Sequence, residues 1–178
     1  MSSLYPADRS HKLRELARLL ARVLGAAALL SALLGALGSH LLWNWTPSLP
    51  CGLYWLSHDT SAEVGTLVAF PVPKSVEPLV TERRYLPPGA LLVKPIVAVG
   101  GDSVCTDSGA LVIQGETFGR VLSEDSAQRP LPWAKVCGPL SEGQVFVASH
   151  HEKSFDSRTF GPVPLGALRG TVTPLWIY

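Results

Sequence analysis

One uninterrupted apolar stretch dominates the beginning of the chain. Residues 23–43 contain no Lys, Arg, Asp or Glu and consist mostly of leucine, alanine and glycine. A helix of about 20 residues crosses the roughly 30 Å hydrocarbon core of a bilayer. The stretch therefore predicts a transmembrane helix over residues 23–43, with Trp43 and Trp45 at the membrane–water interface, where aromatic residues gather.

Beyond residue 44 the hydrophobic pattern changes to a period of two, which is typical of half-buried strands. Glycine-rich and proline-rich turn signals separate the alternating segments, and one short helix is expected near residues 76–84. Strands are predicted at residues 53–56, 65–72, 91–99, 103–107, 110–114, 145–149 and 168–177. The predicted fold class is mainly β, an antiparallel β domain over residues 44–178 preceded by one N-terminal transmembrane helix.

Charge separates the two ends of the chain. The sequence of 178 residues has a formal net charge of only +1, which excludes the basic surplus of a nucleic-acid-binding protein. Residues 1–22 nevertheless carry five basic against two acidic side chains, whereas the remainder is slightly acidic. Because basic flanks stay on the cytoplasmic side, residues 1–22 are predicted to be cytoplasmic and residues 44–178 extracytoplasmic.

A cleaved secretory signal peptide is the alternative to this anchor, since a basic start and an apolar run describe both. We favour a retained anchor because the run exceeds the roughly 7–15 residues of a signal peptide's apolar core. The candidate chemistry also begins directly after the run. In either case residues 44–178 face an oxidising compartment, where disulfides form.

The three cysteines are informative in such a compartment. Cys105 and Cys137 flank a Gly/Ser-rich excursion, so a disulfide between them is predicted, and Cys51 is left unpaired. His150 and His151 have no partner at zinc spacing and indicate a polar turn. No metal site and no cofactor is therefore predicted.

Ser48 is the first residue that could carry chemistry. Pro47 and Pro50 restrict the backbone on both sides of it, which predicts a stiff turn that presents one hydroxyl outward. Ser and Pro also fill ordinary linkers, and on these residues alone an ordinary juxtamembrane linker is the favoured interpretation.

Lys94 is the second residue that could carry chemistry, because it is the only charged residue within 89–101. In the predicted strand it shares one face with Leu92, Ile96 and Ala98, and a buried lysine loses its proton unless it is paired. A neutral amine can act as a general base towards a serine, as in known Ser/Lys enzymes. A lysine that snorkels from an edge strand is the alternative. Pro95 favours an edge strand, to which an extended peptide could pair.

Three ordered segments then give the chain a family resemblance. Residues 46–54 (TPSLPCGLY), 93–102 (VKPIVAVGGD) and 154–163 (SFDSRTFGPV) resemble the sequence boxes of the type I signal peptidase family. The match is closest to its conjugative-transfer, TraF-like branch, which matures pilin precursors. General signal peptidases have Met where this chain has Leu49, and the excursion between Asp102 and Cys137 is too short for the large second β domain of some of them.

The resemblance implies a role for each matching residue. Ser48 matches the nucleophile and Lys94 the general base. Thr46 matches the residue whose hydroxyl supports the oxyanion, and Ser154 matches a serine that orients the lysine. The remaining matches are structural: an ion pair of Asp156 with Arg158, and a turn at Gly101 and Asp102 that closes the lysine strand.

The function so implied is that of a membrane-anchored serine endopeptidase of the bacterial inner membrane, with its catalytic domain in the periplasm. Its partners would be the bilayer, a membrane-tethered signal-bearing or pilin-like precursor, and proteins of the conjugation machinery. Resolution of the acyl-enzyme by an amine would give transpeptidation or cyclisation. A general type I signal peptidase and a catalytically inert, membrane-anchored β scaffold of a secretion or conjugation complex are the alternatives.

Overall fold

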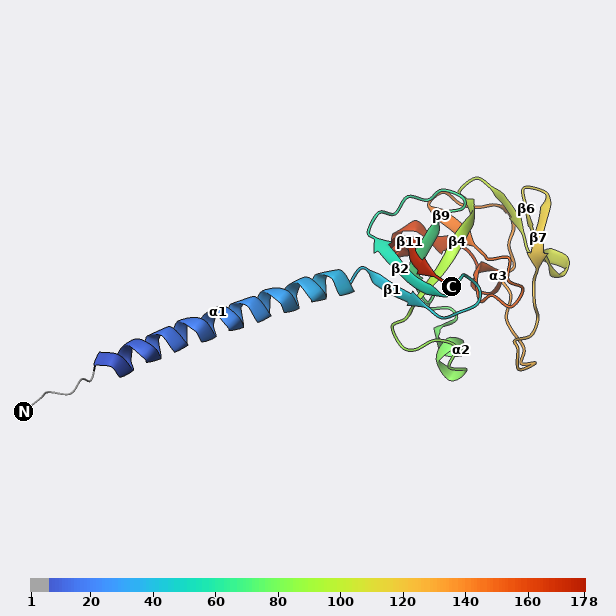
Figure 1. Cartoon of the computed structure of the whole chain (residues 1–178). Helices are drawn as coiled ribbons and strands as arrows, with labels where there is room; N and C mark the ends of the chain where they lie inside the picture. The colour runs from blue at the N-terminus through green and yellow to red at the C-terminus, as the bar shows by residue number, and fades with distance from the viewer. Residues whose placement is uncertain (1–6) are drawn as a thin grey trace, which may run out of the picture. The chain divides into compact units, whose positions relative to one another are not determined.

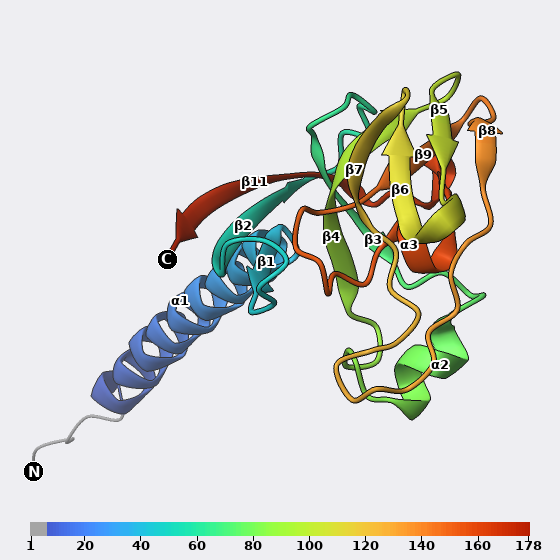
Figure 2. The same ribbon diagram turned by 90° about the vertical axis from the view of Figure 1, so that its right-hand side faces the viewer.

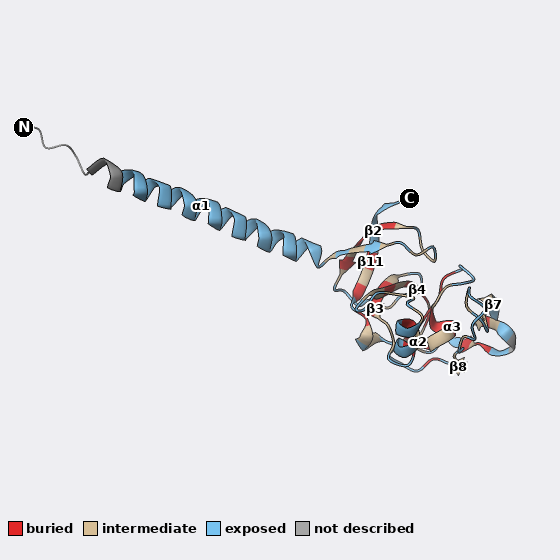
Figure 3. Cartoon of the chain, turned by 90° about the horizontal axis from the view of Figure 1, so that it is seen from below, coloured by how far each residue is buried: buried red, intermediate tan, exposed pale blue. Residues whose placement is uncertain are grey.

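The computed structural model describes residues 7–178, which divide between His40 and Leu41 into a helical unit and a β unit. Helix α1 (Ala7–Gly38) forms the first unit, and its side chains are exposed from residue 11 to residue 38 (Figures 1 and 3). The span His11–Gly38 contains an apolar window of mean hydropathy 2.0. By length and composition α1 can cross a membrane, which fits a membrane-anchored protein.

The end of this helix corrects the predicted boundary. α1 stops at Gly38, and strand β1 (Leu41–Asn44) takes the place of the last residues that we assigned to a helix over 23–43. β1 pairs with residues 52–55 in an antiparallel ladder. Hydropathy did not reveal the boundary because the apolar residues of an exposed helix and of a strand look alike in the sequence.

The second unit consists of two antiparallel sheets, which confirms the mainly β prediction. The larger sheet has seven strands in the order β1-β2-β11-β3-β4-β9-β10, and the smaller has four in the order β7-β6-β5-β8 (Figure 2). Beside β1, the strands of the larger sheet are β2 (Gly52–Ser57), β3 (Leu67–Pro71), β4 (Leu91–Val99), β9 (Gln144–Val147), β10 (Val163–Pro164) and β11 (Gly170–Ile177). The strands of the smaller sheet are β5 (Ser103–Cys105), β6 (Ala110–Ile113), β7 (Glu116–Arg120) and β8 (Cys137–Pro139). The helices of this unit are α2 (Glu77–Glu82) and α3 (Ser157–Phe160), and short 3-10 turns lie at Asp107–Gly109 and Leu165–Ala167.

Each of the seven predicted strands overlaps an observed one, and β4 has the predicted bounds. The short helix expected near residues 76–84 is α2. Strands β1, β7, β8 and β10 were missed. β7 carries mostly polar residues, and β8 and β10 are only three and two residues long, so none of them produces a recognisable alternation.

Strand β4 shows the predicted alternation of buried and partly buried residues. Leu92, Lys94, Ile96 and Ala98 form its buried face. Leu92 and Ile96 belong to the main apolar core, which also includes side chains of β3 and β9. Lys94 is consequently the one charged position in an otherwise apolar buried stripe.

The edge assignment of this strand, drawn from Pro95, was wrong for β4 as a whole. β4 lies between β3 and β9 in the sheet. On the β9 side, however, the ladder starts only at Ile96, and the Pro95 carbonyl accepts a bond from the amide of Ala148. The first half of β4, residues 91–94, is therefore open on that side.

Two features fix the excursion between residues 102 and 137. Cys105 and Cys137 face each other across β5 and β8 and form the predicted disulfide, while Cys51 is free. A cluster around Asp125 ties the far end of the excursion to the segment between α2 and β4. Its carboxylate accepts bonds from Tyr85 Oη at 2.5 Å and from Arg83 at 3.2 Å.

The Asp125 carboxylate also accepts bonds from Arg129 Nε and from the amides of Ala127 and Arg129. Burial alone would raise the pKa of Asp125, but the hydrogen bonds from Tyr85, Arg129 and Ala127 outweigh burial and hold that pKa well below its usual value of 3.8. A carboxyl whose pKa is lowered by folding stabilises the folded state fully while it is ionised in both states, and this stabilisation is lost progressively as the pH falls from the unfolded pKa to the folded pKa.

We therefore expect Asp125→Asn to lower the free energy of unfolding at neutral pH. The difference from the wild type should shrink as the pH falls below about 4, because the Asp125 carboxyl of the unfolded wild type then gains a proton while that of the folded wild type stays ionised. Urea unfolding of the full chain in detergent at several pH values measures this. The control is Asp107→Asn, at an exposed position of the same excursion. A difference that stays constant down to strongly acid pH would contradict the assignment.

Candidate active site

Ser48 lies in the loop between β1 and β2. The amide of Leu49 donates to the carbonyl of Thr46 at 3.4 Å, which closes a turn with Pro47 and Ser48 at its centre. Proline is favoured at the second position of such turns because its φ angle is already fixed. The stiff turn predicted from the two prolines is present, and its serine is half-buried.

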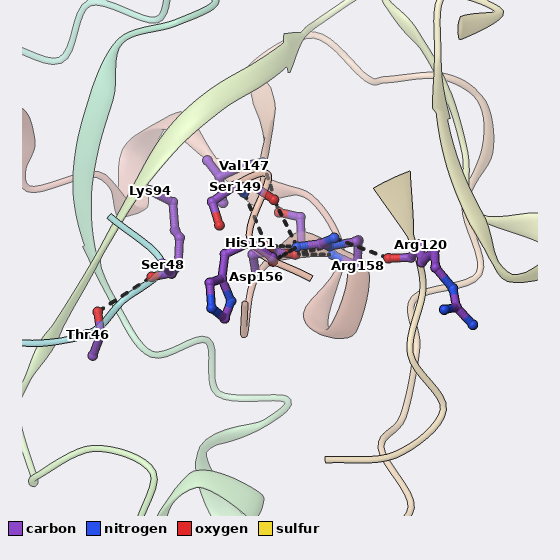
Figure 4. Close-up of polar contacts among 10 residues, drawn as sticks. Thr46, Ser48, Lys94, Arg120, Val147, Ser149, His151, Asp156 and Arg158 are labelled. Carbon is purple, nitrogen blue, oxygen red and sulfur yellow. Dashed lines mark hydrogen bonds and ion pairs between the residues drawn. The ribbon is translucent and has the colours of Figure 1, made fainter. Parts of the chain in front are cut away.

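Lys94 reaches this serine from β4, from a position 46 residues further along the chain. Its Nζ atom lies 2.5 Å from Ser48 Oγ (Figure 4). Only 4% of the lysine is exposed. Among the described residues, Ser48 is the only hydrogen-bond partner of Nζ. The structure thus brings together the two residues that sequence analysis proposed as nucleophile and base.

Burial lowers the pKa of the Lys94 ammonium from 10.5 to about 8. Removal from water is the main cause, since it disfavours the charged form. Asp156 favours the charged form, whereas Arg158 disfavours it. An amine of this pKa is neutral in a large fraction of molecules slightly above neutral pH, and it can then accept the serine proton.

Thr46, the third predicted site residue, also lies beside Ser48. Its Oγ1 atom lies 3.5 Å from Ser48 Oγ and donates to Asn44 Oδ1 at 2.7 Å. Asn44 was not singled out from the sequence. It ends an apolar strand, and no motif or charge marked it.

Asp156 and Arg158 form a buried ion pair in the segment that caps α3. Arg158 binds both carboxylate oxygens, with its Nε and one terminal nitrogen at 2.8 and 2.6 Å. The guanidinium also donates to the carbonyls of Arg120, Ser149 and His151 (Figure 4). The pair therefore connects β7 with the segment that follows β9, which is the arrangement expected of a structural pair.

Of the two remaining predicted residues, Ser154 lies in the cavity with Lys94, whereas Asp102 lies in the turn after β4. Ser154 lines the same cavity as Lys94, but its buried hydroxyl has no hydrogen-bond partner, so the expected contact with the lysine is absent from the described structure. Ser149, which sequence analysis missed, has a second buried hydroxyl without a partner. Asp102 closes the turn after β4 by accepting from the amide of Val99 at 2.9 Å.

A cavity of about 650 Å³ opens onto the serine and the lysine. Its walls are residues 41–48 of β1 and the serine turn, residues 85–94 with the open half of β4, and residues 151 and 153–155. Apolar side chains predominate there. Such a cavity is suited to a short extended peptide with small apolar side chains.

The described residues bring one group of three side chains to metal-ligand distance, Cys105, Asp107 and Cys137. Both cysteines are joined in the disulfide, so neither offers a thiolate. His150 stacks on Phe118 at 4.4 Å between ring centroids. These contacts give no basis for a metal centre.

Known proteins are similar to this chain over most of its length. The family model described as signal peptidase, peptidase S26, matches residues 13–177. A plasmid transfer protein TraF from Escherichia coli is 32% identical over 165 residues, which cover 86% of this chain and 91% of that protein. The conjugal transfer protein TraF of Agrobacterium fabrum is 30% identical over 90% of this chain and 97% of its own length. The crystal structure of a signal peptidase I from Enterococcus faecalis matches 64% of this chain and 97% of its own, with 24% identity and a TM-score of 0.38.

The buried lysine makes a prediction about stability. Below about pH 8 the ammonium is charged in both folded and unfolded chains, and its burial costs about 3 kcal/mol for a shift from 10.5 to about 8. Lys94→Met should therefore raise the free energy of unfolding at neutral pH by up to that amount.

The gain should fade as the pH rises from about 8 towards 10.5, where the lysine becomes neutral in both states. Chemical unfolding of the full chain in detergent at neutral and alkaline pH measures both effects. Lys135→Met, at an exposed position, is the matched control. A Lys94→Met chain that is less stable than the wild type at neutral pH would refute the desolvation argument.

Proposed function

The chain belongs to the signal peptidase family, peptidase S26, and on this premise we propose that it is a membrane-anchored serine endopeptidase with Ser48 as nucleophile and Lys94 as general base. The observation that carries the proposal is the 2.5 Å contact between Lys94 Nζ and Ser48 Oγ in a largely desolvated setting. No histidine takes part, and none is needed when the lysine is neutral.

In the acylation step, neutral Lys94 takes the proton of Ser48 while Oγ attacks the scissile carbonyl carbon. The resulting oxyanion is stabilised by the amide of Ser48 and the hydroxyl of Thr46. When the tetrahedral intermediate collapses, the C–N bond breaks and the Lys94 ammonium returns its proton to the leaving amine. The lysine is then neutral again and can activate the water that hydrolyses the ester.

The substrate is proposed to bind as an extended strand on the open half of β4. The amide and carbonyl of Ile96 bond to residues 65 and 66 on the β3 side. Because backbone polar groups alternate between the two sides of a strand, those of Val93 and Leu91 face the open side. A peptide there would gain main-chain hydrogen bonds and place small side chains in the cavity beside Ser48.

The membrane supplies proximity between enzyme and substrate. We propose that α1 anchors the chain in the inner membrane with its basic N-terminus in the cytoplasm and the β unit in the periplasm, where the disulfide Cys105–Cys137 is stable. Exposed tryptophans lie on β1 and β11, the two neighbours of β2 in the sheet, and Trp43 and Trp176 lie 6.1 Å apart between ring centroids. Such residues favour the interfacial zone of a bilayer.

The substrate class is proposed from the TraF relatives, whose names place them in plasmid and conjugal transfer. A pilin-like precursor tethered in the same membrane is the substrate that we propose, with conjugation proteins as further partners. If an amine instead of water attacked the ester of the acyl-enzyme, a new peptide bond would form to the released segment and no hydrolysis would occur. Mass spectrometry separates these outcomes, because cyclisation of the released segment leaves it lighter by one water.

Ser48→Ala and Lys94→Ala should each reduce cleavage of a precursor peptide in detergent by about four orders of magnitude or more, as removal of a nucleophile or base does in other serine peptidases. Wild-type kcat/KM should increase about tenfold per pH unit up to about pH 8 and then level off, following the neutral form of Lys94.

Ser61→Ala and Lys135→Ala change the same residue types at exposed positions and serve as controls that retain activity. Wild-type cleavage by either active-site variant would exclude this dyad. A rate independent of pH across this range would show that Lys94 does not act as the base.

Removal of the gene from its host should cause one pilin-like precursor to accumulate in the membrane fraction, because the TraF relatives are named for plasmid and conjugal transfer. Quantitative mass spectrometry of membrane proteins detects it. The wild-type gene should restore processing, and the Ser48→Ala gene should not. Accumulation of a broad set of secreted precursors would instead identify a general signal peptidase.

A further inference from the structure

Asn44 is the only asparagine in the sequence, and its side chain holds the serine turn from inside. Its Nδ2 atom donates to the carbonyls of Thr46, Leu49 and Pro50 at 3.1, 3.3 and 3.1 Å. Its Oδ1 atom accepts from the amide and the hydroxyl of Thr46 at 3.1 and 2.7 Å. One side chain thus contacts the residues before and after Ser48.

The orientation of this amide follows from its partners. A backbone amide can only donate, so the atom that faces the Thr46 amide must be the oxygen of Asn44. The atom that faces three carbonyl oxygens must likewise be the nitrogen. A flipped side chain would place like groups against each other at the Thr46 amide and at all three carbonyls; only the Thr46 hydroxyl, which can also accept, would tolerate it.

The same logic settles the proton of Thr46. A hydroxyl has one proton and two lone pairs. Because Asn44 Oδ1 can only accept, the 2.7 Å contact uses the proton of the Thr46 hydroxyl. Thr46 Oγ1 therefore turns a lone pair towards Ser48 Oγ, 3.5 Å away. Thr46 is then unable to donate to the serine oxygen and so cannot weaken it as a nucleophile.

We propose that Asn44 is a positioning residue that keeps the Thr46 hydroxyl proton on its own side-chain oxygen until an oxyanion forms. The inference rests on the proposed function and deepens it. When negative charge develops on the substrate oxygen, rotation about the Thr46 Cβ–Oγ1 bond moves the proton from Asn44 to the oxyanion. No bond is made or broken at Asn44, whose other hydrogen bonds keep the turn in place.

A double-mutant cycle tests the coupling. Thr46→Val removes the hydroxyl with little change in shape, and Asn44→Ala removes its partner. Each should lower kcat about ten- to a hundredfold with little change in KM, since each affects the transition state more than substrate binding. In the double variant the losses should not multiply, because Asn44 acts through Thr46.

Tyr54→Phe is the matched control. Tyr54 Oη donates to the Pro50 carbonyl at 2.6 Å, which Asn44 also contacts, but it does not touch Thr46. The effect of Tyr54→Phe should therefore multiply with that of Thr46→Val. If the losses from Asn44→Ala and Thr46→Val also multiply, Asn44 is only a structural support and the inference is overturned.

A substrate-free measurement separates this inference from the proposed function. Isotope-labelled asparagine gives a single side-chain amide signal in NMR spectra of the full chain in detergent, since the sequence has one asparagine. Thr46→Val should shift that signal. If the wild type is active but the Asn44 signal does not shift in the Thr46→Val variant, this inference is overturned and the proposed function is not. A wild type that cleaves no precursor, but whose signal responds, would overturn the proposed function and leave the hydrogen-bonded arrangement standing.

Discussion

The desolvation of one amine beside one hydroxyl is the constraint on which the candidate active site depends. β4 places Lys94 in the same buried stripe as Leu92 and Ile96, and the core that covers the stripe lowers the lysine pKa to about 8. Asp156 favours the charged form, and Arg158, its ion-pair partner, acts in the opposite direction. The buried pair therefore does more than hold the loop, because it keeps the neighbourhood of Lys94 close to electrically neutral.

Features governed by local periodicity and local backbone restriction were predictable from the sequence. The alternation over residues 91–99 assigned Lys94 to the buried face of its strand, and the two prolines around Ser48 defined a turn. The disulfide followed from two cysteines at the base of one excursion. The proximity of Ser48 and Lys94 is different in kind. It depends on the sheet order, which periodicity does not determine, and it was expected only from the family resemblance.

The features that were missed depend on interactions between distant segments or on loop conformation. β1 is indistinguishable from the end of α1 until its pairing with β2 is known, and the open part of β4 depends on where the β9 ladder begins. The role of Asn44 arises from bonds to carbonyls of a loop. Ser154 was assigned by resemblance to the orientation of Lys94, yet its hydroxyl makes no hydrogen bond in the described structure.

The cavity connects the substrate to this electrostatic constraint. It lies between β1 and the open half of β4 and reaches both Ser48 and Lys94. On the proposed function, a peptide strand that fills it displaces the water that still reaches the amine, and further desolvation favours the neutral form. The base would therefore be most completely deprotonated when a scissile bond is in place. On the same proposal, the partial charge on Lys94 limits the activation of Ser48 while no substrate is bound, and substrate binding would raise the neutral fraction of the lysine.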